Sequence, residues 1–67
     1  MRKFAKRLKE LRKERGFSME ALSKATGIGE ASISRWENGQ SDISSDRLVQ
    51  LSEFFGVTVI YLLGLED

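Results

Sequence analysis

Glycines divide this chain into short segments, and their spacing restricts the possible fold more than any other feature. Five of the six glycines stand directly after stretches with helical apolar periodicity, and proline is absent. Glycine is favoured just beyond a helix C-terminus because, without a Cβ, it adopts the left-handed conformation that ends the helix. Stops at Gly16, Gly27, Gly39, Gly56 and Gly64 predict five short helices.

The segments between these glycines give approximate helix bounds. The predicted helices run from about residue 2 to 15, from just after Ser18, from about 30 to 37, from near Ser44 or Ser45, and from just after Thr58. A β-branched run at 57–60 is the one ambiguous segment, and its length favours a helical turn or two over a lone strand. The expected fold is all-α, one compact domain of five short helices over residues 1–67.

Apolar residues at helical spacing predict which sides of the helices are buried. Phe4, Leu8 and Leu11 form a stripe on the first helix. The inward residues expected on the later helices are Ala21, Leu22, Ala25, Thr26, Ile33, Trp36, Leu48, Leu51, Phe55, Leu62 and Leu63. We expect Trp36 to be a core residue and not a platform for stacking bases.

Composition removes most kinds of enzyme site. The 67 residues include no Cys and no His, which excludes disulfides, thiolate and imidazole ligands, and a histidine general base. The carboxylates do not cluster at metal-ligand spacing, so we expect no metal, cofactor or small-molecule ligand, and a small enzyme is the weakest function class. The longest apolar stretch, at 57–65, is too short to cross a bilayer, and no signal peptide is recognisable. Both observations predict a cytoplasmic protein without a membrane partner.

A net charge of +1 conceals a strong asymmetry along the chain. Residues 1–15 carry eight Lys or Arg and two Glu, whereas residues 16–67 carry three Lys or Arg and eight acidic residues. A basic first helix on a nearly neutral protein favours phosphate binding, but a solvated helix face gives the same pattern. Charge alone leaves these two interpretations open.

The turn at 26–29 carries the functional signal. It joins the second and third predicted helices through three or four residues that include glycine, which is the connection of a helix-turn-helix spanning about 18–37. In that motif the second helix enters the major groove, so one side must be buried while the other faces DNA. Ile33 and Trp36 lie on the expected buried side. The opposite side carries Glu30, Ala31, Ser34 and Arg35.

Residues 7–64 resemble the lambda-repressor/Cro-type helix-turn-helix family, the XRE-like transcriptional regulators. The segments that carry this resemblance are Arg7-Leu8-Lys9-Glu10-Leu11-Arg12, Gly16-Phe17-Ser18, Glu20-Ala21-Leu22, Gly27-Ile28, Ile33-Ser34-Arg35-Trp36-Glu37-Asn38-Gly39, Leu48, Leu51, Phe55-Gly56-Val57-Thr58 and Leu62-Leu63-Gly64. A glycine-turned helix pair alone is weakly specific. The run from Ile33 to Gly39 in this register is far more specific.

The resemblance implies roles for individual residues. Glu30, Ala31, Ser34 and Arg35 match base-reading positions, and arginine paired with guanine is the commonest specific contact. Ser18, the Met19 amide, Asn38 and the Gln40 amide match phosphate-binding positions, and Arg12 and Glu37 match a pair in which the arginine bridges the glutamate and a phosphate. Each residue also has a purely structural interpretation: an exposed cation for Arg35, a helix-start acid for Glu30, a turn residue for Asn38, and an ion pair without phosphate for Arg12.

Three departures from the family pattern affect the expected affinity. Met19 stands where glutamine is usual, so only its backbone amide remains for a phosphate. Gly29 replaces the usual Ser or Thr cap of the third helix, and the loop at 40–42 lacks the basic residues often found there. We expect weaker phosphate contacts and an unchanged fold.

One reading helix covers only a few base pairs, so a two-fold dimer on half-sites one helical turn apart is expected. Ile60 occupies a position that is commonly acidic in the family, and Tyr61 and Leu65 lie near it. These three residues are the predicted homodimer contact. The alternatives are that Ile60 belongs to the monomer core, or that the chain is a DNA-binding fragment whose dimerisation domain is absent.

The sequence therefore predicts sequence-specific binding to double-stranded DNA by a prokaryotic or phage transcription regulator. We favour repression because it requires only occupancy of the site. The alternative is a protein-interaction module, such as an antitoxin-like partner, with weak or no DNA binding. Acidic Glu30 and a loop without basic residues favour this alternative, whereas Arg35 and the basic first helix oppose it.

Overall fold

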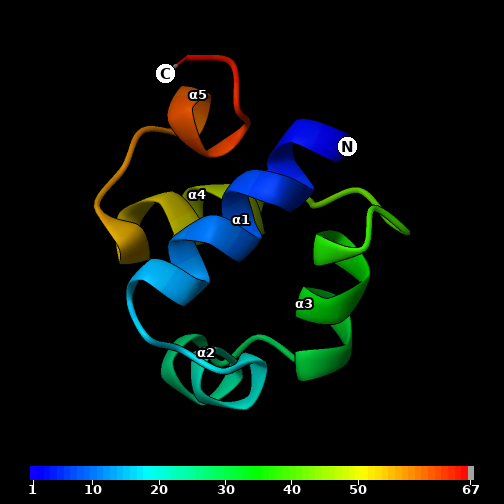
Figure 1. The fold of residues 1–67 in the computed structure, drawn as a ribbon, viewed down its shortest axis with the longest axis vertical. Helices are drawn as coiled ribbons and strands as arrows, with labels where there is room; N and C mark the ends of the chain where they lie inside the picture. The colour runs from blue at the N-terminus through cyan, green and yellow to red at the C-terminus, as the bar shows by residue number, and fades with distance from the viewer. Residues whose placement is uncertain (67) are drawn as a thin grey trace.

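The computed structural model describes residues 1–66 and contains five α-helices and no strand within that range. They are α1 (Arg2–Glu14), α2 (Met19–Thr26), α3 (Glu30–Glu37), α4 (Ser45–Phe55) and α5 (Val59–Leu62) (Figure 1). The all-α prediction is confirmed, and the ambiguous run at 57–60 leads into the short helix α5. Residue 67, the last of the predicted domain, lies outside the described residues.

Local side-chain and glycine chemistry sets the helix ends. Ser18, Ser44 and Thr58 each accept a hydrogen bond from the backbone N–H three residues later, and so cap α2, α4 and α5. At the other end of α2, Gly27 adopts φ +77°, a left-handed conformation that non-glycine residues reach at a cost. The serine and glycine signals in the sequence therefore mark real helix boundaries.

The core lies where all five helices converge. The apolar side chains in it are Phe4, Leu8, Leu11, Leu22, Ile28, Ile33, Trp36, Leu51, Phe55 and Leu62. Trp36 is a core residue, as predicted. The expectation for Ala25 was wrong, because Ala25 is exposed. The helix α2 lies at the edge of the bundle, and the rest of the protein covers only one side of it (Figure 1). Leu22 lies on that covered side and is buried.

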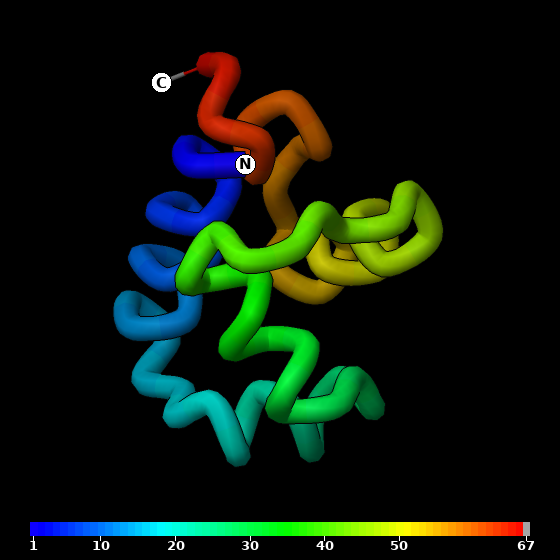
Figure 2. The backbone as a smooth tube through the Cα atoms, turned by 90° about the vertical axis from the view of Figure 1, so that its right-hand side faces the viewer, coloured from blue at the N-terminus to red at the C-terminus, as the bar shows by residue number. Residues whose placement is uncertain are grey.

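The helix α1 forms the centre of the arrangement. It packs against α3 along one side and against α5 near its N-terminus, while α2 packs on α3 and α4 on α5. Figure 2 shows α3 towards the viewer with α1 along one side of the molecule. Within residues 1–66, no helix combines the length and apolar character needed to cross a membrane, and no three His, Cys, Asp or Glu side chains gather where they could hold a metal ion.

Candidate nucleic-acid interface

Side-chain hydrogen bonds hold the turn between α2 and α3 in one conformation. The Thr26 hydroxyl donates to the Leu22 carbonyl at 2.8 Å and accepts from the Ile28 N–H at 3.2 Å, and the Ser23 hydroxyl donates to the Ile28 carbonyl. From α4, the Gln50 side chain donates to the Thr26 carbonyl at 2.7 Å. The two helices of the motif are thus fixed relative to each other and to α4.

Sequence reasoning missed two residues that hold this turn. Ile28 is fully buried although it lies in the turn, and its side chain anchors the connection in the core. Gln50 reaches the turn from a helix more than twenty positions away. No local pattern marks a glutamine for such a contact, because its partner is a backbone carbonyl that only the tertiary fold brings near.

The helix α3 divides its residues between the core and the outside. Ile33 and Trp36 are buried, whereas the predicted base-reading residues lie on the outer side: Glu30, Ala31 and Arg35 are exposed and Ser34 is half-buried. The Arg35 guanidinium makes only a long contact of 3.4 Å with the Ser32 hydroxyl. Its donors are therefore available to a ligand that lies against α3.

A buried ion pair fixes α3 against α1. Arg12 donates from Nε to one Glu37 oxygen at 2.7 Å and from Nη2 to the other at 3.0 Å, and the two residues are only 7% and 9% exposed. The Arg12 Nη1 group donates to the Phe17 carbonyl at 2.9 Å, which ties in the segment before α2. The hydrogen bonds that Arg12 donates to Glu37 raise the pKa of Arg12, although burial opposes this effect.

The predicted phosphate-binding residues differ in which hydrogen-bond donors remain unused within the protein. The Ser18 oxygen accepts from the Ala21 N–H at 3.0 Å, which leaves its hydroxyl proton free to donate. The Met19 N–H opens the first turn of α2 and has no acceptor among residues 1–66. The Gln40 N–H already donates to the Arg35 carbonyl at 2.8 Å, so only the exposed Gln40 side chain is available.

Asn38 follows the last residue of α3 and is exposed beside the outer side of that helix. Its side-chain amide lies 3.4 Å from the Ser34 hydroxyl, a contact at the long limit of hydrogen bonding. The other N–H of that amide has no partner among the described residues. Asn38 is thus both the turn residue that the sequence suggested and a free donor next to α3.

Comparison with known proteins agrees with this geometry. The profile of the helix-turn-helix family matches residues 8–62. This chain belongs to the helix-turn-helix family. It is 34% identical over 62 residues to the HTH-type transcriptional regulator ImmR of Bacillus subtilis, covering 92% of this chain and 49% of that protein. It is 36% identical over 64 residues to YobD of the same organism, described as an uncharacterized HTH-type transcriptional regulator, covering 96% and 57%.

A solved structure supports the same helix-turn-helix fold. The restriction-modification controller protein C.AhdI of Aeromonas hydrophila superposes with a TM-score of 0.82 at 30% identity, covering 91% of this chain and 92% of that one. The chain spans about half the length of the curated relatives named above. The family is one of transcription regulators and not an enzyme class.

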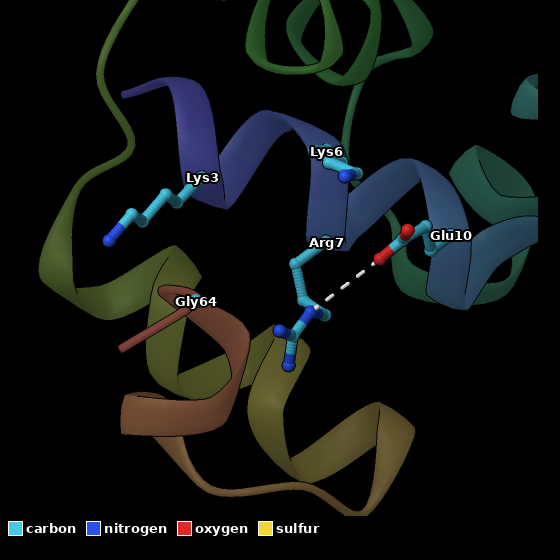
Figure 3. Close-up of a pocket in the computed structure, with 5 residues that line it drawn as sticks. All are labelled: Lys3, Lys6, Arg7, Glu10 and Gly64. Carbon is cyan, nitrogen blue, oxygen red and sulfur yellow. Dashed lines mark ion pairs between the residues drawn. The ribbon is translucent and has the colours of Figure 1, made fainter. Parts of the chain in front are cut away.

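The C-terminal end of this helix-turn-helix domain leaves apolar side chains outside. Ile60 is 53% exposed and Leu65 is 66% exposed, so Ile60 does not belong to the core of the monomer. Tyr61 is half-buried under the Arg7 guanidinium, which lies 4.1 Å from the ring centre, while Arg7 also donates to the Tyr61 carbonyl at 3.0 Å. Figure 3 shows Arg7 reaching from α1 towards this end.

Proposed function

We propose that this helix-turn-helix domain binds double-stranded DNA sequence-specifically and regulates transcription, with α3 in the major groove. The observation that carries the proposal is the division of α3: its inner side is locked by Ile33, Trp36 and the Arg12–Glu37 pair, and its outer side presents free polar groups. The major groove admits one α-helix and displays a distinct donor and acceptor pattern for each base pair. A rigid helix with free outward donors is what reading that pattern requires.

The outer side chains of α3 differ in what they can read. The free Arg35 guanidinium suits the O6 and N7 acceptors of guanine, which it can bind with two hydrogen bonds. The exposed Glu30 carboxylate can accept from the cytosine amino group, and the Ala31 methyl can contact a thymine methyl. Ser34 can donate or accept. Of these four residues, Arg35 carries most of the discrimination in our proposal.

Phosphate contacts would fix the domain on the duplex. The Ser18 hydroxyl, the Met19 N–H and the Asn38 amide have donors left over after their internal contacts. Gln40 contributes through its side chain in this proposal, because its N–H is already engaged. Arg12 has three of its five N–H groups occupied by Glu37 and Phe17, so any bridge to a phosphate uses the other two.

We further propose that the domain acts as a homodimer through Ile60, Tyr61 and Leu65. The support is that Ile60 and Leu65 expose large apolar side chains at one end of the molecule, next to Tyr61. A dimer doubles the number of base pairs read and makes the operator two-fold symmetric. We propose repression, because occupancy of such a site is enough to block transcription. We also propose that the protein acts in the cytoplasm of a prokaryotic cell, since its proposed ligand is DNA.

The test is in vitro selection from random duplex DNA at near-physiological salt, with wild type and Arg35→Ala side by side. We expect wild type to enrich a two-fold-symmetric consensus and Arg35→Ala to lose preference at one base pair in each half-site, a cost of about 1–3 kcal/mol per contact. The matched control is Lys3→Ala, which removes an exposed cation that is not among the proposed DNA contacts. No enrichment by wild type would overturn the proposal and favour the protein-interaction module.

A further inference from the structure

Seven of the eight cations in residues 1–15 fall into two sets with different surroundings, and Lys3 belongs to neither. One set consists of three arginines that all bind groups of this chain. Arg7 donates to the Tyr61 carbonyl, Arg12 to Glu37, and Arg15 to the Phe55 carbonyl at 2.7 Å. Arg7 and Arg15 thereby satisfy carbonyl oxygens near the ends of α5 and α4. These arginines hold the fold together and have little left for an outside partner.

The other set is unpaired and lies along one line of α1. We call Arg2, Lys6, Lys9 and Lys13 the α1 stripe. Their spacing of four, three and four residues puts them on one side of the helix, over a length of about 16 Å. All four are exposed, and none makes a side-chain hydrogen bond or an ion pair within residues 1–66. In Figure 3, Lys6 lines the same pocket as Arg7 and Glu10, and the ion pair there joins Glu10 to Arg7.

The surface around the helix-turn-helix lacks a comparable excess of positive charge. Over residues 18–42 the exposed charged side chains are Glu20, Lys24, Glu30, Arg35 and Asp42, three acids against two cations. Protein affinity for DNA that is independent of sequence comes mostly from cations that displace counterions from phosphates. The surface formed by residues 18–42 cannot supply much of that attraction, whereas the α1 stripe can.

We infer that the α1 stripe is a second, sequence-independent contact with the phosphate backbone of DNA. The inference rests on the DNA binding proposed above. The stripe is held in a fixed relation to α3 by the Arg12–Glu37 pair, and α1 and α3 lie side by side in both views (Figures 1 and 2). Over about 16 Å, B-DNA carries about nine backbone charges, enough to engage all four cations. The backbone belongs either to the flank of the same duplex or to a second duplex.

The experiment measures binding to duplex DNA as a function of salt for wild type and the triple variant Lys6→Gln, Lys9→Gln, Lys13→Gln. We expect the slope of log affinity against log salt to become shallower by about 2–3 per domain, since each phosphate contact contributes about 0.9. The matched control changes the same lysines to arginine, which keeps the charge and therefore the slope. Circular dichroism verifies that the helices are retained, because glutamine suits an exposed helix position.

The outcomes separate this inference from the proposed function. If wild type selects a consensus and the glutamine variant keeps both that consensus and the wild-type slope, the stripe inference is overturned and sequence reading stands. If wild type binds no DNA, both fail. If the slopes of wild type and the glutamine variant differ only on duplexes that extend beyond the consensus, the stripe contacts the flank of the same duplex. If the measured mass of the complex corresponds to two duplexes, the stripe contacts a second duplex. Either of these last results supports the inference.

Discussion

The two ends of the molecule are stabilised in different ways. At the helix-turn-helix end, α1, α2 and α3 are joined by the buried bidentate Arg12–Glu37 ion pair, by the hydrogen bonds of the turn and by the Trp36 ring. The outer side of α3 at this end is polar. At the C-terminal end, the four-residue helix α5 is held by Leu62, by Arg7 and by a close approach of Gly64 to α1, and the outer side is apolar.

This difference indicates what kind of partner each end suits. A polar outer side on a rigid support loses little on meeting a hydrated, charged ligand, and it can place hydrogen bonds accurately. An apolar outer side gains when it is covered by another apolar surface. The helix-turn-helix end is therefore suited to DNA, and the C-terminal end to a second protein surface. Four changes test this contrast.

The largest effect is expected from Glu37→Ala, which leaves the buried Arg12 charge without its carboxylate partner. We expect the free energy of unfolding to fall by about 3–5 kcal/mol in urea titrations. The matched control is Glu10→Ala, which removes the exposed member of the Arg7–Glu10 pair at 3.7 Å and should cost less than about 1 kcal/mol. Equal effects of the two substitutions would mean that the buried pair does not hold this end together.

A somewhat smaller effect is expected from Ile60→Asp on self-association. Burying a fully exposed isoleucine contributes about 1.5–3 kcal/mol. Ile60 is already about half buried, so its two copies in a two-fold interface gain about that amount together, and the dimer Kd should rise about 10- to 150-fold. Because Ile60 is 53% exposed, the monomer should stay folded. Analytical ultracentrifugation measures the shift, with Val49→Asp on α4 as the control at another exposed apolar residue. Unchanged association in Ile60→Asp would contradict a dimer through this surface.

Gly64→Ala tests how closely the C-terminal turn is fitted to α1. Gly64 has φ +77°, and a Cβ there would lie 2.7 Å from the Lys3 Cβ and 3.2 Å from the Lys3 carbonyl oxygen. A left-handed alanine costs about 1–2 kcal/mol, and the clash raises the expected total to about 2–3 kcal/mol of unfolding free energy. Gly27→Ala has the same φ and open space, so it should show the left-handed cost alone. Identical losses would mean that the turn moves away from α1 easily.

The smallest effect on stability is expected from Ser18→Ala, about 1 kcal/mol for a lost helix cap. Ser44→Ala removes the cap of α4, which is longer at 3.4 Å, and should cost no more than Ser18→Ala in thermal unfolding. Only Ser18 lies at a proposed phosphate contact, so affinity for the selected duplex should fall in Ser18→Ala and not in Ser44→Ala. Parallel loss of affinity in both variants would assign Ser18 a purely structural role.

Much of the helix-turn-helix end could be read from the sequence because its signals are local. Ser18 and Gly27 mark the ends of α2 through hydrogen bonds and dihedral preferences that involve only a few neighbouring residues. The alternation of buried Ile33 and Trp36 with outward Ser34 and Arg35 follows from helical periodicity alone. The division of α3 into an inner and an outer side was therefore predictable.

The errors and omissions occur where distant segments meet. Ala25 has the right spacing for burial, but α2 lies at the edge of the bundle and nothing covers that position. The sequence did not predict the contact of Gln50 with the turn, because its partner is a backbone carbonyl on another helix.

The sequence by itself determined the five helices, most of the core and the outward residues of α3, since these depend on periodicity and on capping within a turn of helix. Only the tertiary structure decided which charges of α1 are used internally. Helical spacing puts the α1 stripe on one side of the helix, but it does not show which cations find acceptors in other helices. The fold brings Glu37 and the carbonyls of Tyr61 and Phe55 to three arginines and leaves the α1 stripe without partners, because those acceptors come from α3, α4 and α5.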